Sequence, residues 1–553
     1  MLHPANLLRN EKIAAFIAAN PITLTVLVCI AWIIPGLIGH DPWKPDEAHS
    51  FGVVYQLLKN GDWVVPMLAG EPFLDKPPLI YLTAALTGAL FSPILPLHDG
   101  ARLATGVYMA LAFLFIALTA KELYGSSKSW VAALMLLGCG GLLLRGHLLI
   151  PDTALLAGLA IGLYALAISA RRPLIAGLWL GTGLGVCILS EGLVEPVMLL
   201  LTMALLPLVS AHWRTRQYLL TVLLALVVVT PWAVVWPLLL KARSPRLFAE
   251  WFWVENVARL RGIFLFTPDD NFTYYANVLP WFAWPAWPFA VWSLWAEGRA
   301  GLRKPGVVLP LTAFAAFFLF LSILGEGRDI YGMPLLLPIS LLAVVSFETL
   351  QRGAANLYYW FAIILFTFFA IVGWFYWAAI DLGVPSRLWK HMMDMQPNYR
   401  SGGHVVVVVL AALFTFAWLL LLFNVKRQPE RPVITWAIGM TMLLALVALL
   451  LVGYIDAGKT YRAVFTQLSQ AVPASHGCIY SKSLGEPQRA MLHYFGNIRT
   501  VRLEKPGSPP SCNLLIVQDR LKSPTEVGGS WHLIWEGRRP GDKLERFRLY
   551  RQS

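Results

Sequence analysis

Long apolar stretches alternate with short polar segments as far as about residue 453. A helix needs about 20 mostly apolar residues to cross the hydrocarbon core of a bilayer. Runs of about that length recur along the chain, so the pattern predicts a polytopic α-helical membrane protein with about 13 spans. The runs that span, or nearly so, begin near residues 22, 103, 130, 152, 174, 195, 217, 277, 307, 332, 356, 403 and 434.

One further apolar run, residues 79–97, decides the topology. It contains Pro93 and Pro96 and follows a diproline. If the N-terminus is cytoplasmic and this run does not span, every short cytoplasmic loop is basic, as the positive-inside rule requires. If the run did span, Arg171 and Arg172 would lie outside. We therefore expect a juxtamembrane or re-entrant helix at 79–97 and an outward-facing C-terminus.

The last hundred residues have a different pattern. Short alternating runs bounded by turn residues predict strands, and two amphipathic segments predict helices. The expectation is a transmembrane domain over 1–453 and a small outward-facing α/β domain over 454–553. Its two cysteines, Cys478 and Cys512, leave a disulfide open, because two cysteines alone do not establish a pairing. The expected strands are Cys478–Ser481, Thr500–Leu503, Asn513–Gln518, His532–Glu536 and Arg546–Tyr550, and the expected helices are Tyr461–Val472 and Gln488–Phe495.

Composition supports the membrane assignment. Hydrophobic residues make up 57% of the 553 residues and charged residues 14%, whereas soluble domains carry about 25% charged residues. This excludes a disordered chain, a nucleic-acid-binding module or a soluble dinucleotide-binding enzyme as a description of the whole chain. The net charge is +13. In a membrane protein, an excess of Lys and Arg first indicates which loops face the cytoplasm. The C-terminal domain contributes 15 Lys/Arg against 8 Asp/Glu, which suits either anionic head groups or a solvated surface.

Acidic residues gather on the predicted outer side, in a first loop (41–102), at span ends and in a long loop (241–276). Asp46 and Glu47 follow the first span directly. Adjacent carboxylates repel each other, which suits a general base or a cation ligand. Alternatively, the acids after Pro45 mark the first turn of a helix. The residues alone leave both interpretations open.

A second unusual segment reads Asp75-Lys76-Pro77-Pro78-Leu79-Ile80-Tyr81. Proline fixes its own φ and holds the preceding residue extended. A lysine held rigidly at a membrane surface is a suitable ligand for a phosphate group.

These two segments together resemble the GT-C membrane glycosyltransferases of the dolichyl-phosphate-mannose-protein mannosyltransferase-like superfamily, in particular the bacterial lipid A aminoarabinose transferases. Further segments are similar to the family pattern as far as about residue 340. They are Pro151-Asp152-Thr153, Glu255-Asn256-x-x-Arg259 and Gly327-Arg328-Asp329-Ile330-Tyr331-Gly332-Met333-Pro334.

The resemblance implies a GT-C fold in the bacterial inner membrane, with the active site and the C-terminal α/β domain facing the periplasm. The implied activity is inverting transfer of a sugar from a polyprenyl-phosphate (undecaprenyl-phosphate) donor to lipid A or lipopolysaccharide. A protein O-glycosyl(mannosyl)transferase of the same fold and a lipid-linked-sugar transporter or flippase stay open, with Glu191 and Glu195 as the transporter candidates. The expected partners are donor, acceptor and membrane lipids, without nucleic acid, and the expected state is a monomer.

Carried over residue by residue, the resemblance and the charge pattern nominate three groups. The catalytic candidates are Asp46, Glu47 and Asp152. The candidates for binding the donor phosphate and lipid are Lys76, Tyr81, Arg259, Arg261, Arg328 and Tyr331. Asp75 is the candidate ligand of a divalent cation, Mg²⁺ or Mn²⁺, because both prefer oxygen ligands.

The chain departs from the family pattern at three places. Ala48-His49-Ser50 stands where aminoarabinose transferases usually have Arg-Tyr, and Ser190-Glu191-Gly192 stands where Lys-Gly is common. Asp75 replaces the more usual glutamate. The departures leave the reaction class in place and leave the sugar and the acceptor open.

Overall fold

A computed structural model describes residues 19–552 except 265–272, 325–326, 398, 401, 506–510, 522, 524, 529 and 543, together with residues 11, 12 and 15. Part of the predicted long loop (265–272) lies outside the described residues.

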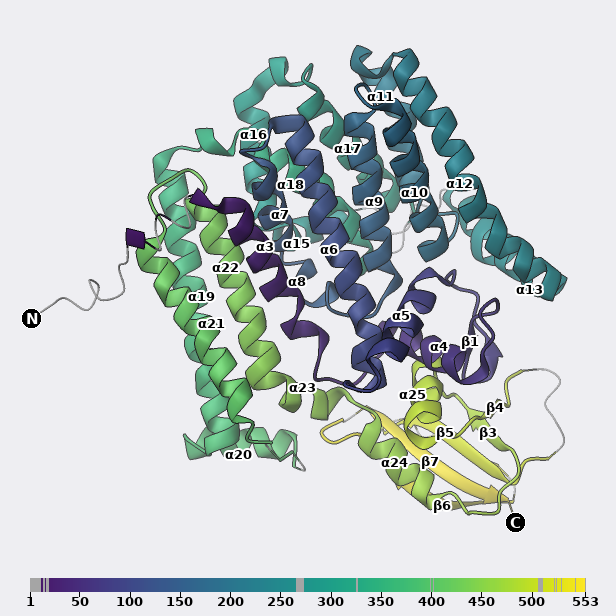
Figure 1. Cartoon of the computed structure of the whole chain (residues 1–553). Coiled ribbons are helices and arrows are strands. Elements are labelled where there is room, and N and C mark those ends of the chain that lie inside the picture. The colour runs from purple at the N-terminus through teal and green to yellow at the C-terminus, as the bar shows by residue number, and fades with distance from the viewer. Residues whose placement is uncertain are drawn as a thin grey trace, which may run out of the picture.

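A bundle of apolar helices makes up most of the molecule (Figure 1). Within the described residues, eight helices are long and apolar enough to cross a membrane. This confirms a multi-pass membrane protein. Seven of them are α6 (Leu97–Tyr124), α9 (Pro151–Ile168), α10 (Pro173–Glu191), α12 (Arg216–Arg243), α17 (Pro305–Leu324), α19 (Arg352–Leu382) and α21 (Val405–Asn424). The eighth covers Arg431–Ala471 and contains α22 (Arg431–Leu446), the π-helical η6 (Val447–Leu451), α23 (Val452–Lys459) and α24 (Arg462–Ala471).

Several of the expected spans are shorter helices. Near residues 130 and 277 the expected continuous spans are broken, and the two breaks face each other. Gly140 donates a backbone hydrogen bond to the carbonyl of Trp284 (3.1 Å), and Gly141 donates one to that of Phe282 (2.8 Å). The interrupted helices thereby satisfy each other's backbone groups. These shorter helices are α3 (Pro21–Ile33), α7 (Ser129–Leu137), α8 (Leu142–Arg145), α11 (Val197–Val209), α15 (Tyr274–Phe282), α16 (Ala286–Gly301) and α18 (Leu336–Val344).

The segment that decided the predicted topology forms α5 (Leu79–Phe91). At 1.5 Å per residue its 13 residues extend about 20 Å, against about 30 Å for the hydrocarbon core. The helix packs against α6 and against α4 (Asp46–Asn60). Figure 1 places α4, α5 and the C-terminal domain at the same end of the bundle.

Connecting segments at this end carry the candidate site. A small hairpin of β1 (Met67–Leu68) and β2 (Glu71–Pro72) precedes α5. After α12 come α13 (Pro245–Ala249), the π-helical η3 (Glu250–Ala258) and α14 (Arg259–Phe264). The 3-10 helix η4 (Asp329–Leu335) leads into α18. Between α19 and α21 lies α20 (Ser386–Met395).

The C-terminal domain is the predicted α/β unit. Its sheet has the order β4-β3-β5-β7-β6; β3 runs parallel to β4 and β5, and β7 runs antiparallel to β5 and β6. All five expected strands and both expected helices are confirmed within one or two residues at their ends. The strands are β3 (Ile479–Lys482), β4 (Val501–Arg502), β5 (Leu514–Arg520), β6 (Trp531–Gly537) and β7 (Glu545–Gln552), and the second helix is α25 (Glu486–Gly496).

The domain shares a hydrophobic core with the first loop of the membrane domain. Phe51 and Val54 of α4 belong to the same buried cluster as Met491 and Leu492 of α25. Gly52 permits this close approach, because a Cβ there would lie 2.5 Å from the Cβ of Ala490. Apolar burial of this kind stabilises by about 25 cal/mol per Å², so the C-terminal domain and α4 form one packed unit.

The question of the two polar cysteines is answered by the structure. Cys478 and Cys512 form a disulfide between the segments that lead into β3 and β5. Cys29, Cys139 and Cys187 are free thiols.

The disulfide predicts a thiol count. Under denaturing, non-reducing conditions three cysteines react with a maleimide, and five react after reduction, read as mass shifts. The bond closes a loop with a sequence separation of 34 residues, so the Cys478→Ser/Cys512→Ser double variant loses roughly 2–4 kcal/mol of domain stability. Cys29→Ser is the control. Five reactive thiols without reduction would contradict the pairing.

Candidate active site

The helix α4 begins at the acidic pair, which the N-terminal end of the helix dipole favours. Its first two residues point in different directions. Asp46 lines a small cavity, whereas Glu47 is 2% exposed and binds Arg102. The pair therefore starts a helix, as one interpretation predicts, and one member faces a cavity, while the role of general base or cation ligand stays a prediction.

Glu47 is enclosed by hydrogen-bond donors. Its Oε1 accepts from Nε of Arg102 (2.6 Å) and from the backbone N–H of Leu149 (3.3 Å), and its Oε2 accepts from that of Trp43 (3.1 Å). Burial by itself would raise the pKa of the Glu47 carboxyl, but the Arg102 guanidinium and the hydrogen bonds hold that pKa below its usual value. Glu47 does not line the cavity and its oxygens accept hydrogen bonds inside the protein, so its predicted catalytic role stays a prediction.

Arg102 organises the segment that leads to Asp46. Besides Glu47, it donates to Oδ1 of Asp99 (2.7 Å) and to the carbonyls of Leu37 (3.0 Å) and His40 (2.9 Å). The arginine is 1% exposed. Charge-assisted hydrogen bonds in a buried setting are strong and directional. They hold the turn between the first span and α4 in one conformation.

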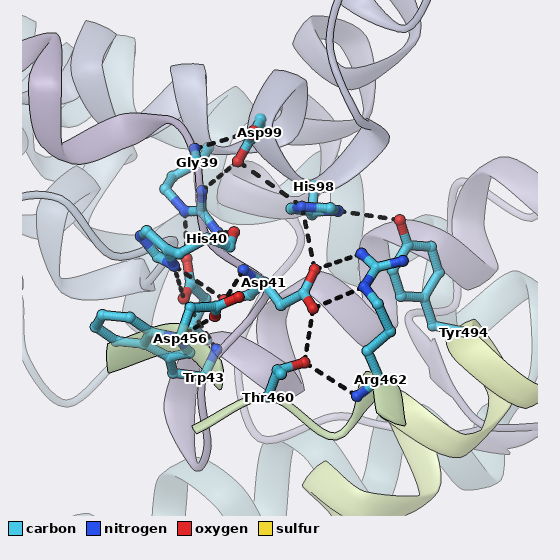
Figure 2. Close-up of polar contacts among 12 residues, drawn as sticks. Gly39, His40, Asp41, Trp43, His98, Asp99, Asp456, Thr460, Arg462 and Tyr494 are labelled. Carbon is cyan, nitrogen blue, oxygen red and sulfur yellow. Dashed lines mark hydrogen bonds and ion pairs between the residues drawn. The ribbon is translucent and has the colours of Figure 1, made fainter. Parts of the chain in front are cut away.

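The C-terminal domain holds the same turn from the other side (Figure 2). Asp41 accepts from Nε (2.9 Å) and Nη2 (2.5 Å) of Arg462 and from the hydroxyl of Thr460 (2.6 Å). Asp456 accepts from the backbone N–H of Asp41 (3.0 Å) and from the indole N–H of Trp43 (2.8 Å). The segment before Asp46 is thus held by the bundle and by the C-terminal domain together.

Most of the predicted site residues meet at one cavity of about 60 Å³. Since a water molecule takes up about 30 Å³, this space is smaller than a sugar. Seven of the ten predicted residues line it: Asp46, Asp75, Lys76, Tyr81, Asp152, Arg328 and Tyr331. His49, Ser50, Phe73, Pro151 and Ile330 complete the lining.

An ion pair joins two residues of the cavity lining. Nη2 of Arg328 donates to both carboxylate oxygens of Asp46, at 2.7 and 2.9 Å, and Nη1 donates to the hydroxyl of Tyr331 at 3.3 Å. Burial by itself would lower the pKa of Arg328, but the bond to Asp46 raises that pKa above its usual value. Arg328 is 47% and Asp46 32% exposed, and pairs at such exposure contribute about 0–1 kcal/mol. The pair can therefore open at little cost.

A second ion pair lies deeper. Nζ of Lys76 is 2.5 Å from Oε2 of Glu191, and both residues are buried. Burial by itself would lower the pKa of the Lys76 amine, but the carboxylates of Glu191, Glu195 and Asp75 raise it well above its usual value. Lys76, the predicted phosphate ligand, therefore stays positively charged and is paired with a carboxylate of the protein itself.

The arginines of the long loop differ from the prediction. Nη2 of Arg259 donates to Oε1 of Glu195 (3.2 Å), and neither Arg259 nor Arg261 lines the cavity. Arg261 is exposed. Arg259 thus contacts the buried acids beside Lys76, and the donor-binding role expected for these two arginines stays a prediction.

The residues that the sequence left unassigned are partners of the predicted ones. Glu191 pairs with Lys76, and its position was visible as a departure from the family pattern. His49 lines the cavity, and its Nε2 lies 3.7 Å from a carboxylate oxygen of Glu486 in α25. Burial lowers the pKa of His49 despite the nearby carboxylates. The C-terminal domain thereby reaches the rim of the cavity.

The described residues contain no cluster of three or more His, Cys, Asp or Glu side chains suited to hold a metal ion. Asp75 lines the cavity as an exposed single carboxylate. The divalent cation stays a prediction, and the reaction steps below use only side chains of this chain.

Comparisons with known proteins agree with this arrangement. Residues 75–236 match the family described as dolichyl-phosphate-mannose-protein mannosyltransferase. The structure of ArnT from Cupriavidus metallidurans, crystallised with undecaprenyl phosphate, superposes with a TM-score of 0.69 at 18% identity, over 96% of this chain and 97% of that one. This chain has the GT-C fold. The resemblance inferred from the sequence motifs is confirmed.

Two sequence relatives are named undecaprenyl phosphate-alpha-4-amino-4-deoxy-L-arabinose arabinosyl transferases. The one from Serratia proteamaculans is 25% identical over 347 residues, 59% of either chain. The one from Pseudomonas paraeruginosa is 31% identical over 250 residues, 43% of this chain and 44% of its own. The chain thus spans about half the length of the relatives it matches.

The buried arginine gives a stability prediction. Arg102→Ala leaves Glu47 and Asp99 as uncompensated buried charges, which lowers the free energy of unfolding by about 3–5 kcal/mol. The measurement is denaturant unfolding of the detergent-solubilised protein. The matched control is Arg171→Ala, since Arg171 is 74% exposed in its pair with Glu122 and its loss changes stability by about 1 kcal/mol or less. Equal effects of the two substitutions would show that Arg102 does not organise the turn.

Proposed function

We propose that the protein is an inverting membrane glycosyltransferase that moves a sugar from an undecaprenyl-phosphate carrier to lipid A at the periplasmic face of the bacterial inner membrane. The observation that carries the proposal is the meeting of Asp46 with Lys76, Arg328 and Tyr331 around one cavity at the end of a GT-C bundle. The names of the relatives and the undecaprenyl phosphate bound by ArnT support the carrier. Lipid A as the acceptor follows from the resemblance of the sequence motifs.

The charges around the cavity suit this reaction. A polyprenyl phosphate is an anion at a low-dielectric boundary, so it needs fixed cations and hydroxyl donors. Lys76 supplies a permanent positive charge, Arg328 a planar pair of donors, and Tyr331 a hydroxyl. The guanidinium that now binds Asp46 is well suited to bind phosphate instead.

The transfer then follows a single displacement. An acceptor oxygen attacks the anomeric carbon, and a bond forms between them as the bond from that carbon to the phosphate oxygen breaks. The phosphate leaves with the electron pair beside Lys76, Arg328 and Tyr331. Asp46 takes the proton of an acceptor hydroxyl as general base. If the acceptor is an ionised phosphate, Asp46 orients it instead. Asp152, at the start of α9, lines the same cavity and positions the sugar.

The opening of the Arg328–Asp46 pair links the two roles. While the pair is formed, both carboxylate oxygens accept hydrogen bonds from Arg328 and the cavity is too small for a sugar. Donor phosphate competes with Asp46 for Arg328. Its binding therefore enlarges the cavity and releases the base in the same movement.

Two features support an orientation in which the C-terminal domain faces the periplasm. The disulfide of the C-terminal domain suits an oxidising compartment such as the periplasm. Three of the basic loops predicted for the cytoplasmic side meet at one cavity, lined by Lys128, Arg171 and Lys304, that shares no residue with the candidate site, in agreement with the positive-inside rule.

The test of the proposal is Asp46→Asn in vesicles supplied with an undecaprenyl-phosphate sugar and lipid A. Transfer falls by about 10²- to 10⁴-fold, as for loss of a general base or orienting group, while undecaprenyl phosphate still binds. Asp62→Asn is the control, since Asp62 lies in the same loop, pairs with Arg243 and does not line the cavity.

Mass spectrometry of the cell envelope of a deletion strain identifies the acceptor. Loss of a sugar from lipid A supports the proposal, whereas loss from envelope proteins would identify a protein glycosyltransferase. Movement of the lipid-linked sugar across the membrane without any new covalent product would identify a transporter.

A further inference from the structure

Two buried acids, Glu191 and Glu195, lie behind Lys76, the predicted phosphate ligand, and have no role in the proposed transfer. Lys76 lines the cavity, whereas Glu191 lies behind it and does not. Lys76 is 9% exposed and Glu191 2%. Among the described residues that line the cavity, Lys76 is the buried cation near the predicted phosphate position. Its charge is therefore already neutralised by Glu191.

The surroundings of Glu191 contain more acids than cations. From the loop before α5 comes Lys76, from α9 Asp152, and from the segment after α10 Glu195, whose own partner is Arg259. Tyr81 of α5 and Cys187 of α10 also face this carboxylate. When all these acids are ionised, the group carries one more negative than positive charge before any phosphate is bound.

One oxygen of Glu191 is unusual. Its Oε1 is buried and has no hydrogen-bond partner in the part of the chain that the structure describes, and the same holds for Oε2 of Glu195. A buried acceptor without a partner is costly, and a carboxyl that takes up a proton becomes a hydrogen-bond donor. Of these two acids Glu191 is the partner of Lys76, so its protonation is the one that frees this ammonium when another anion arrives.

We propose that Glu191 is a proton-accepting counter-ion of Lys76, so that a lipid phosphate and one proton from the aqueous phase bind to the site together. The proposal rests on the proposed function, because it assumes that Lys76 faces the donor phosphate. Glu191 acts through Lys76 and is a positioning residue. With Glu191 ionised, the ammonium is shared and phosphate binds weakly. With Glu191 protonated, the full charge of Lys76 is available to phosphate.

The experiment uses the full-length protein in lipid nanodiscs and undecaprenyl phosphate as the probe. Calorimetry in two buffers with different ionisation heats gives the number of protons taken up on binding. Wild-type protein takes up about one proton more than Glu191→Gln does. Above neutral pH its affinity also falls more steeply, by up to about tenfold more per pH unit. Glu191→Gln binds more tightly at high pH, with a flatter pH profile.

A matched control removes the same charge from a different lysine–acid pair. Glu297 lies 2.7 Å from Lys304 in a separate part of the protein, and Glu297→Gln leaves proton uptake and affinity unchanged. Equal uptake and affinity in wild type and Glu191→Gln would overturn the proposal. Failure of undecaprenyl phosphate to bind the wild type would instead overturn the proposed function.

A second measurement covers the case in which Glu191→Gln does not fold. Infrared difference spectra of the wild type show a new carbonyl band of a protonated carboxyl when undecaprenyl phosphate binds. In Glu191→Asp, which keeps an ionisable group, the band is present at a shifted frequency. No band in the wild type, or an unshifted band in Glu191→Asp, would assign the proton elsewhere and overturn the proposal.

Discussion

The geometry of the site depends on a single buried guanidinium. Arg102 binds two carboxylates and two backbone carbonyls at distances of 2.6 to 3.0 Å. Because a charge in the interior must be fully paired, this arginine leaves the turn before α4 one acceptable conformation. Glu47 is turned inward by that requirement, and Asp46, its neighbour on the helix, is turned toward the cavity.

The C-terminal domain stabilises the same turn before α4. Its hydrophobic core continues into α4, and Arg462 fastens Asp41 at the base of the turn. Figure 2 shows that these contacts come from segments far apart in the chain. A small soluble domain appended to a membrane enzyme is often regarded as a separate module. Here it packs against the segment that holds Asp46, the candidate base, and places Glu486 at the rim of the cavity.

The cations of the site are each paired with an acid of the protein. Arg328 binds Asp46, Lys76 binds Glu191, and Arg259 binds Glu195. Such pairing is the condition for keeping charges at a low-dielectric boundary. It also means that an incoming anion exchanges one partner for another rather than filling a vacant charge. The exposed pair exchanges at little cost, whereas the buried pair requires compensation, which a proton supplies.

The sequence by itself determined the elements of this protein and most of the site's members. Apolar runs and alternating strands are local patterns, so the bundle, the α/β domain and its five strands followed from periodicity. Seven of the ten nominated residues line the cavity because acids and cations at span ends must come to the same membrane surface. Helix interruptions near 130 and 277 escaped notice, since they depend on two glycine-containing breaks that satisfy each other.

Only the tertiary structure decided which charge faces which. Asp46 and Glu47 are adjacent carboxylates that the sequence alone does not distinguish. The structure distinguishes them, because Arg102 binds Glu47. Lys76 and Glu191 are more than one hundred residues apart, and no local pattern relates them. The pairing of Cys478 with Cys512 likewise required the two strands to be adjacent. Local periodicity places a residue on a face or at a boundary. The partner of a buried charge is set by which helices pack together, because the interior cannot leave that charge alone.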